Sequence, residues 1–471
     1  MTILGTRAHV VNTIFRIWSS GNRKFSHTHG TLGLSYPNKK SFIYLRKSER
    51  YTSTMFSEKS KSLTGFKFTD YDCIGFDLDN TLSRYKVGAM IEMEYDIMAK
   101  FLVEKKGYSK KHLYKPFDHN FILRGLIVDD ENGNILRIAP DGYILQAAHG
   151  TKMLQDEEIE KYYPRRHWEI SDLFVQDPLT TWNGPYSEKM RTLLDYFDIA
   201  SSLIFARAID AVDEQKGQKT GKYEVWLDIQ AALQDMFNRD NFQTGAGLYF
   251  EKMKANPEKY YYKCSDKLLN WLKLLKKQNK SLFLLTGSHV DFASHTATNT
   301  VGPNWRDYFD IVVCFAKKPG FFTLKRDFLK LDGVHEGPAV KLDQLEIGGM
   351  YTHGNWTDLH KFLTKHLKKD NPKFLYIGDN LVQDIYTPHI HSHCDTVTVC
   401  EELEAEGVQG YHERHPDQHF LVSTFWGSYF TCNKADTNWA FLMKKHSKLC
   451  VPSLEYVASL PIDHEYEASD V

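Results

Sequence analysis

The sequence predicts an α/β protein built on a doubly wound, mainly parallel sheet of the Rossmann-like kind. Four short apolar runs bounded by polar residues support this prediction: 73–76 (CIGF), 282–285 (LFLL), 310–315 (DIVVCF) and 374–378 (FLYIG). Such runs are typical of strands buried on both faces of a parallel sheet. The segment 266–278 has leucines and a tryptophan on one face and lysines on the other, which predicts a helix between strands.

Size and composition indicate a folded protein with more than one unit. The chain has 471 residues, which exceeds what one hydrophobic core usually serves. Hydrophobic residues make up 42% and charged residues 25% of it, and these are ordinary values for a globular protein. The 7 cysteines contain no CxxC pair, which favours reduced, buried thiols over a disulfide framework.

The charge balance gives no indication of a polyanionic partner. There are 59 basic and 60 acidic side chains and the net charge is −1, so no global field attracts nucleic acid or an anionic membrane. No apolar stretch approaches the roughly 20 residues that span a bilayer. We therefore predict neither nucleic acid nor a membrane as a partner.

Residues 1–65 differ in composition from the rest of the chain. The first acidic residue is Glu49, and the residues before it mix Arg and Lys with Ser, Thr and apolar side chains. This composition is the signature of a mitochondrial transit peptide. The alternative is a disordered leader on a cytoplasmic protein, untranslated if synthesis begins at Met55. In either case we expect this segment to lie outside the fold.

The uneven spacing of the strands predicts an inserted domain. Roughly 200 residues separate Asp79 from Thr286, far more than a crossover between parallel strands needs. A large cap inserted after the first strand explains this spacing. The predicted units are a core at 66–104 and 262–410, a cap at 105–261, and a C-terminal extension at 411–471 that packs on the core.

The cap should contain both strands and helices. Asn132–Gly133 and Asp141–Gly142 are hairpin turn signals between apolar runs. Helical periodicity follows at 186–212 and 223–237. An α/β or mainly helical cap is the simplest interpretation, and a last helix is expected within the final segment VPSLEYVASLP.

Polar side chains follow each of the four predicted strands. Asp77 and Asp79 come directly after the first run, and side chains two apart share a face in an extended stretch. By itself this DxDxT pattern is weak, because a turn or a helix cap explains it equally well. The order of the further groups strengthens it: Thr286, Lys318, and Asp379 with Asp384 each follow another strand. Ligand sites of such sheets lie just past the carboxyl ends of the strands.

With these four motifs in order, the sequence resembles the haloacid dehalogenase superfamily, and Asp79 at the second acidic position is similar to its phosphatase and mutase branch. More specifically it resembles the cytosolic purine 5′-nucleotidase family. The likeness runs from about residue 66 to the final VPSLEYVASLP, through GFDLDNTLSRY, GNILRIAPDGYILQAAHGTKML, LLTGSHVDF, AKKPGFF and YIGDNLVQDI. One departure is Gly287, where related members often have Asn.

The resemblance implies a Mg²⁺-dependent phosphatase that hydrolyses a small phosphate ester, such as a nucleoside monophosphate, through an aspartyl phosphate. Asp77 would be the nucleophile, and Asp79 would pass a proton to the leaving group and then take one from water. Because the substrate is an anion, the carboxylate must be neutralised. Asp77, Asp379 and the backbone carbonyl of Asp79 would hold Mg²⁺.

The remaining motif residues have supporting roles in this scheme. Lys318 supplies a second positive charge, and the Thr286 hydroxyl donates to phosphoryl oxygens. Asp384 would orient Lys318 or a metal-bound water, although a purely structural role is equally open. Asp79 could likewise be a structural hydrogen-bonding carboxylate.

Several cap residues could contact the nucleoside. Arg207 and Asp210 lie three apart on a predicted helix, and they could bind a purine edge or form an ordinary intrahelical ion pair. An ion pair is the commoner explanation. Four aromatic residues could stack on a base, although core packing is the default for aromatics at helical spacing: Trp182, Tyr186, Tyr196 and Phe197.

Two further patterns are set aside. His389, His391, His393 and Cys394 have metal-ligand side chains, but a surface loop explains their crowding better, because true sites need converging ligands. The segment 217–222 (GQKTGK) fails the spacing of a phosphate-binding P-loop and lacks a preceding buried strand. We interpret it as a solvated basic loop.

Two other functions stay open from the sequence. In a phosphotransferase, an alcohol would replace water in discharging the aspartyl phosphate. In a scaffold, the phosphatase fold would bind a phosphorylated ligand and turn over slowly or not at all. The complete set of motif residues favours hydrolysis over both.

Overall fold

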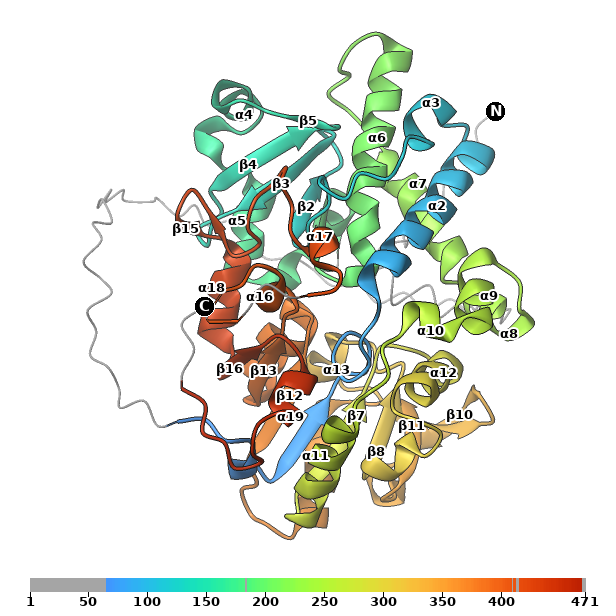
Figure 1. Cartoon of the computed structure of the whole chain (residues 1–471), viewed down its shortest axis with the longest axis vertical. Helices are drawn as coiled ribbons and strands as arrows, with labels where there is room; N and C mark the ends of the chain where they lie inside the picture. Colours follow the sequence, from blue (N-terminus) through green and yellow to red (C-terminus); the bar gives the residue numbers. More distant parts are fainter. Residues whose placement is uncertain (1–64, 183, 409, 412–414, 468–471) are drawn as a thin grey trace, which may run out of the picture.

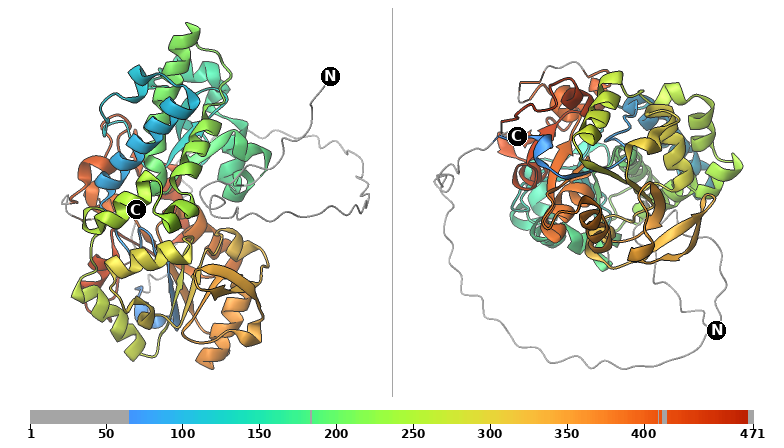
Figure 2. Two further views of the ribbon diagram at one scale, coloured as in Figure 1. Left: turned by 90° about the vertical axis from the view of Figure 1, so that its right-hand side faces the viewer. Right: turned by 90° about the horizontal axis from the view of Figure 1, so that it is seen from below.

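The structure is a computed structural model that describes residues 65–182, 184–408, 410–411 and 415–467. The predicted leader, 1–65, lies outside the described residues except for Gly65. The chain folds into two lobes, with the core in the lower half of Figure 1 and the cap in the upper half. Figure 2 shows the same two lobes from the side.

The core is organised around a mainly parallel sheet, as the sequence predicts. Its described part has 9 strands in the order β10-β9-β11-β8-β7-β1-β12-β13-β16, and the strands from β11 to β16 are parallel to one another. The four predicted strands are all present, as β1, β7, β8 and β12. The parallel strands are β1 (Cys73–Phe76), β7 (Ser281–Leu285), β8 (Ile311–Cys314), β11 (Gly349–His353), β12 (Phe374–Gly378), β13 (Asp395–Val399) and β16 (Leu449–Val451).

Each central strand divides its side chains between two hydrophobic clusters, one on each face of the sheet. In β7, Leu282 and Leu284 belong to one cluster whereas Phe283 and Leu285 belong to the other. This alternation follows from the period of two along a strand. Because both faces are buried, every position in the strand is apolar or small, and the sequence shows a continuous run.

Helices cover both faces, so the doubly wound arrangement is confirmed. One face is packed by α11 (Asp266–Lys277), α12 (Val290–Thr300) and α19 (Leu454–Ala458), and the other by α13 (Gly320–Thr323) and α14 (Trp356–Leu367). The predicted helix at 266–278 is therefore α11. Leu274, which belonged to its predicted apolar face, is 41% exposed.

The hairpin at one edge of the sheet was not predicted. Strands β9 (Phe328–Asp332) and β10 (His335–Val340) are antiparallel, and β9 pairs with β11. Most of their side chains are exposed or half-buried, so the segment lacks the apolar run of a buried strand. The Asp332–Gly333 turn signal was its only indication in the sequence.

The cap contains a second, antiparallel sheet in the order β5-β4-β3-β2-β6. Both predicted hairpins are present, because Asn132–Gly133 joins β2 to β3 and Asp141–Gly142 lies between β3 and β4. The strands are β2 (Leu126–Asp129), β3 (Asn134–Ile138), β4 (Ile144–His149), β5 (Lys152–Met153) and β6 (Met190–Leu193).

The first half of one predicted cap helix contains a strand instead of helix. Residues 190–193, inside the segment 186–212, form β6 and pair with β2, and the helix α6 begins only at Ile199. Local helical periodicity was overruled by pairing with an existing sheet edge, a tertiary effect. The second predicted cap helix, at 223–237, is confirmed as α7 (Val225–Met236).

Helix α2 (Val87–Lys106) packs against α6 (Ile199–Lys216) and α7. It therefore lies with the cap, although most of its residues fall inside the range 66–104 that we assigned to the core. Helical periodicity alone does not show which domain a helix faces. The other cap helices are α3 (Lys110–Leu113), α4 (Asp156–Tyr162), α5 (Glu169–Gln176), α8 (Arg239–Thr244), α9 (Leu248–Ala255) and α10 (Pro257–Tyr260).

The C-terminal extension contacts both lobes. Its strand β16 pairs with β13 in the core sheet, while the indoles of Trp426 and Trp439 donate to the cap carbonyls of Phe121 and Gly125 at 2.8 Å. The predicted last helix is α19. The extension also contains α17 (Gln418–Leu421), β14 (Thr431–Cys432), β15 (Ala435–Asp436) and α18 (Asn438–His446). The segment before the extension contains α15 (Thr387–Ser392) and α16 (Glu402–Ala405). Of the helices in the described part of the chain, none is long and apolar enough to cross a membrane.

Candidate active site

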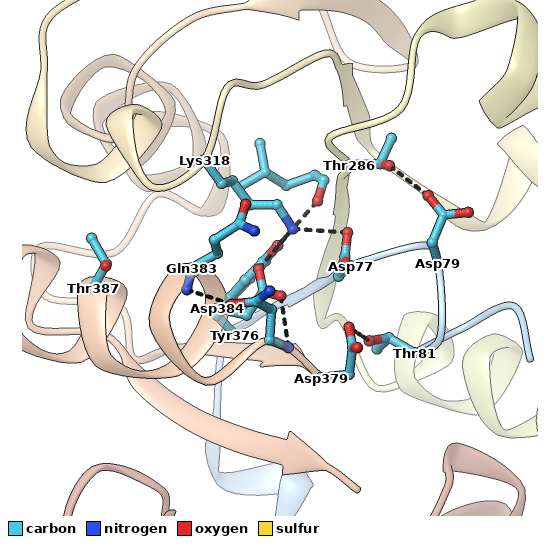
Figure 3. Close-up of polar contacts among 12 residues, drawn as sticks. Asp77, Asp79, Thr81, Thr286, Lys318, Tyr376, Asp379, Gln383, Asp384 and Thr387 are labelled. Carbon is cyan, nitrogen blue, oxygen red and sulfur yellow. Dashed lines mark hydrogen bonds and ion pairs between the residues drawn. The ribbon is translucent and has the colours of Figure 1, made fainter. Parts of the chain in front are cut away.

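A cavity lies where the carboxyl ends of the central core strands face the cap. It encloses about 630 Å³, including the solvent at its mouth. Figure 3 shows Asp77, Lys318 and Asp379 close together, each from the segment that follows a core strand. The described lining consists of Asp77, Asp79, Asp195, Phe197, Phe237, Tyr249, Gly287, Ser288, Phe292, Lys318, Asp379, Asn380, Gln383 and Asp384.

Asp77 is held by strand pairing at its backbone and by an ion pair at its carboxylate. Its N–H donates to the carbonyl of Ile377 in β12 at 2.8 Å, so its position continues the ladder of β1. Its Oδ1 lies 2.8 Å from Lys318 Nζ. The side chain is 10% exposed, and this remaining access is on the cavity.

Lys318 is a buried ammonium group surrounded by acceptors. Its Nζ donates to Asp384 Oδ1 at 2.7 Å and to the Tyr376 hydroxyl at 3.3 Å, in addition to its ion pair with Asp77. Burial acts to lower the pKa of Lys318, but Asp384 and Asp77 raise it well above its usual value. The ammonium therefore stays charged next to Asp77.

Asp79 is bound by three hydroxyl groups. Tyr85 donates to its Oδ1 at 2.7 Å, while Ser288 and Thr286 donate to its Oδ2 at 2.7 Å and 3.3 Å. Burial raises the pKa of Asp79, and these hydrogen bonds oppose the rise. The carboxyl group is thus oriented toward the cavity and has a raised affinity for a proton.

Thr286 supports Asp79 in this structure and is not part of the described cavity lining. Its side chain is fully buried, its hydroxyl donates to Asp79, and its oxygen accepts the N–H of Ser288 at 3.0 Å. Gly287 and Ser288 follow it and do line the cavity. The role of Thr286 as a direct phosphate donor stays a prediction.

Asp379 has one carboxylate oxygen that is free for a ligand. Its Oδ1 accepts from the Thr81 hydroxyl at 3.5 Å, whereas its buried Oδ2 accepts no hydrogen bond from the described residues. Carboxylate oxygens of Asp77, Asp379 and Asp384 lie within 4.8 Å of one another. An unsatisfied buried oxygen in a group of carboxylates fits a hard divalent cation such as Mg²⁺.

Asp384 is less available to a metal than the other two. Its Oδ1 accepts from Lys318, and its Oδ2 accepts the N–H of Asn380 at 3.3 Å. The residue lies on a π-helical turn, Leu381–Tyr386, whose start is capped by the Asn380 side chain. A Cβ at Gly378 would lie 2.4 Å from the Asp384 Cβ, so glycine lets this turn approach the strand. These contacts agree with a role in orienting Lys318.

The cavity is short of positive charge. Burial raises the pKa of Asp77 well above its usual value, an effect that Lys318 opposes. Burial also raises the pKa of Asp379, and the carboxylates of Asp195, Asp77 and Asp384 raise it further. In the described lining, five carboxyl groups face a single ammonium group. A bound cation would relieve this repulsion.

The cap closes the cavity with an acid and several aromatic rings. Asp195 precedes the short helix Tyr196–Asp198, and Phe197 packs edge to face on Phe237, with ring centroids 6.1 Å apart. The ring centroid of Tyr249 lies 4.9 Å from that of Phe237. Of the aromatic residues named from the sequence, only Phe197 lines this cavity in the described residues, whereas Trp182 lines a separate, smaller hollow in the cap.

The structure does not bring Arg207 and Asp210 to the cavity. Arg207 donates to the Tyr95 hydroxyl and to the carbonyls of Lys115 and Pro116, so its guanidinium holds a cap loop. Asp210 accepts from the N–H and hydroxyl of Thr151. The two residues therefore bind different partners, and no Arg207–Asp210 ion pair is found in the described residues. Sequence spacing could not show which face of that helix is turned inward.

The two patterns that were set aside take no part in the site. His389 and His391 lie on α15 rather than on a loop, and the metal-ligand group found among the described residues is the aspartate cluster. The segment 217–222 follows the end of α6 and is largely exposed.

Sequence reasoning missed several residues of the site. Ser288 and Asp195 line the cavity, and Tyr85 and Arg124 contact its acids. Ser288 follows a predicted strand end closely enough to have been named. Tyr85 lies six residues after Asp79, within the segment GFDLDNTLSRY, and could also have been named. Asp195 and Arg124 come from distant segments, and no local pattern marks them.

Comparison with known proteins places the chain in a family. The model of the 5′ nucleotidase family matches residues 64–422. The human 5′-nucleotidase domain-containing protein 1 is 33% identical over 433 residues, covering 85% of this chain and 92% of its own length. The bovine protein of the same name is 33% identical over 428 residues, with the same coverage.

A more distant relative also carries the 5′-nucleotidase name. The human 5′-nucleotidase domain-containing protein 2 is 28% identical over 352 residues, covering 72% of this chain and 62% of its own. The match of the family model spans the described core from its first strand to β13 and includes the cap. It confirms the resemblance drawn from the motifs: the chain belongs to the 5′ nucleotidase family, whose name denotes phosphoric monoester hydrolases.

Proposed function

We propose that this protein hydrolyses a nucleoside 5′-monophosphate, with Mg²⁺ as its cofactor and an aspartyl phosphate on Asp77 as its intermediate. One observation carries the proposal. Asp77 lines a cavity in which Lys318 Nζ lies 2.8 Å from its carboxylate, and a carboxylate oxygen of Asp379, which has an unsatisfied Oδ2, lies within 4.8 Å of it.

Asp77 and Asp379 are the side chains that would hold Mg²⁺, with the backbone carbonyl of Asp79 as the third protein ligand expected from the sequence. When bound, the ion supplies the positive charge that lets a carboxylate meet an anionic phosphate. Asp384 is excluded from this ligand set in our proposal, because both of its oxygens already accept hydrogen bonds.

The chain's own residues account for the covalent steps. An oxygen of Asp77 forms a bond to phosphorus as the bond to the leaving oxygen breaks. Asp79 gives its proton to that leaving oxygen, and Lys318 balances charge on the phosphoryl group. Water then attacks phosphorus and gives a proton to Asp79, the bond to Asp77 breaks, and phosphate leaves.

The substrate class follows from the cap side of the cavity and from the family. Phe197, Phe237 and Tyr249 form an aromatic wall across from the acids, and flat aromatic rings bind a purine or pyrimidine face by stacking. The relatives carry the 5′-nucleotidase name. A nucleoside is the leaving group that suits both observations.

The test is phosphate release from a panel of substrates. The purified chain would be incubated with nucleoside monophosphates and with sugar phosphates that carry no base, each in the presence of Mg²⁺ and in the presence of a chelator. We expect inorganic phosphate from nucleoside monophosphates, and its loss with the chelator. Folded protein that releases no phosphate from any member would overturn the proposal in favour of a scaffold.

A further inference from the structure

Arg124 is a buried cation at the junction of the two lobes. It lies two residues before β2 in the cap sheet, and β2 pairs with β6 from Leu126 onward. Its side chain is 1% exposed. The guanidinium lies between two rings, 4.5 Å from the centroid of Tyr196 and 5.0 Å from that of Tyr429. The cap and the C-terminal extension thus enclose it from both sides.

One side of the guanidinium is anchored to the core. Its Nη2 donates to Glu402 Oε2 at 2.7 Å and to Cys400 Sγ at 3.2 Å. The Tyr196 hydroxyl donates to the same Glu402 oxygen at 2.8 Å. A fully buried ion pair with shared hydrogen bonds has little freedom to move. Cap residues Arg124 and Tyr196 are therefore docked on one core glutamate.

The other side of the guanidinium faces Asp379. Its Nη1 donates to the Asp379 carbonyl at 3.5 Å and lies 3.9 Å from Asp379 Oδ2. The second distance is too long for a hydrogen bond, and this Oδ2 is the oxygen that accepts none from the described residues. Arg124 is thus close enough to limit where the carboxylate sits but leaves its ligand oxygen free.

We propose that Arg124 is a positioning residue that holds Asp379 in the orientation required for metal binding and makes that orientation depend on the docked cap. This inference rests on the proposed function, in which Asp379 binds Mg²⁺. Arg124 itself touches neither the substrate nor the metal in this scheme.

The effect is one of position rather than of net charge. Arg124 and Glu402 form a buried ion pair, so their opposite charges largely cancel at the metal site. A lone cation beside a metal ligand would weaken metal binding by repulsion. If position dominates, losing the guanidinium lowers the affinity for Mg²⁺. If charge dominates, losing it raises that affinity.

The experiment measures the dissociation constant of Mg²⁺ alone by titration calorimetry on the full chain. Arg124→Lys keeps the charge and loses the planar group, and we expect it to weaken Mg²⁺ binding about tenfold or more, as residues behind a metal ligand do. At saturating Mg²⁺ we expect its KM for the substrate to stay unchanged. Asp379→Asn provides the reference for a lost metal ligand.

Arg84→Lys is the matched control. Arg84 pairs with Glu401, the residue before Glu402, at 3.2 Å, and its Nη2 lies 3.1 Å from His415 Nε2, so this variant disturbs a comparable Arg–Glu contact. Arg84 has no contact with Asp379 among those found in the described residues. We expect its Mg²⁺ affinity to match that of the unmodified protein, with any loss confined to thermal stability.

Arg124→Met with Glu402→Leu removes both charges and protects the test against misfolding from an unpaired glutamate. Weaker Mg²⁺ binding in this folded double variant supports the proposal. Unchanged or tighter binding in both Arg124 variants overturns it while leaving the proposed function intact. Absence of Mg²⁺ binding by the unmodified protein would instead overturn the metal role of Asp379, and the inference with it.

Discussion

The two walls of the cavity differ in what their residues bind. On the core side the charged groups are tied to one another, as when Lys318 bridges Asp77 and Asp384. On the cap side the groups are aromatic rings that pack on one another, with Asp195 among them. Under the proposed function, the core wall would move charge and protons, and the cap wall would stack on the flat base of the leaving nucleoside.

Under the same proposal, this difference would separate chemistry from selectivity within one fold. The core residues lie at the ends of paired strands, whose register leaves them little freedom. The cap residues lie in helices and loops, and their contribution is mainly contact area. Changes on the core wall should therefore reduce turnover for every substrate, and changes on the cap wall should act through KM.

The largest effect is expected for Asp77→Asn. The amide has the same size but is a poor nucleophile, so we expect phosphate release to fall by more than about a thousandfold. Thermal unfolding should show that the fold is kept. Retained turnover of any phosphate ester by this variant would contradict the nucleophile assignment and, with it, the chemical role of the core wall.

Lys318→Gln should affect both activity and stability. Its loss leaves Asp77 and Asp384 buried without a cation, and breaking a buried ion pair costs about 3 to 5 kcal/mol. We expect kcat/KM to fall by roughly two to three orders of magnitude. Urea unfolding and phosphate release provide the two readouts, and Lys318→Arg, which keeps the charge, is the control. An active, fully stable Gln variant would contradict the electrostatic account.

Phe197→Leu tests the cap wall. The leucine keeps an apolar side chain but cannot stack on a ring, so we expect KM for nucleoside monophosphates to rise about tenfold, with kcat retained. KM for a sugar phosphate that carries no base should not change. An equal rise for both substrates would show that Phe197 acts through the core wall, for example by its edge-to-face contact with Tyr85 at 5.2 Å.

The smallest effect on catalysis is expected at Glu401, which is not among the described residues that line the cavity. Burial acts to raise the pKa of Glu401, but Arg84 and His415 outweigh it and lower the pKa from 4.5 to about 2. A lowered folded-state pKa gives stability that is present above pH 4.5 and is lost as the pH falls toward about 2.

Glu401→Gln should therefore weaken the dependence of stability on pH in that acid window and leave kcat at neutral pH unchanged. Urea midpoints between pH 5 and about pH 2.5 would measure this dependence for both proteins. If the urea midpoints of the two proteins depend on pH in the same way, Arg84 and His415 do not lower the pKa of Glu401.

Most of the core wall could be predicted from the sequence, and most of the cap wall could not. Asp77 and Asp379 each directly follow an apolar run, and Asp79 comes two residues after Asp77, so their place at the sheet edge follows from local sequence. Arg124 and Asp195 come from segments that have no such marker. The segment that contains β6 shows why, because its helical periodicity was overruled by pairing with β2.

The sequence by itself determined the parallel core, the insertion of a cap and the order of the reactive groups, because strand burial and motif spacing are properties of short stretches. Only the tertiary structure decided which cap residues face the acids, that Arg207 points elsewhere, and that Arg124 reaches Asp379 across the lobes. Such contacts join residues far apart in the chain, and their energies depend on the packing of both lobes at once.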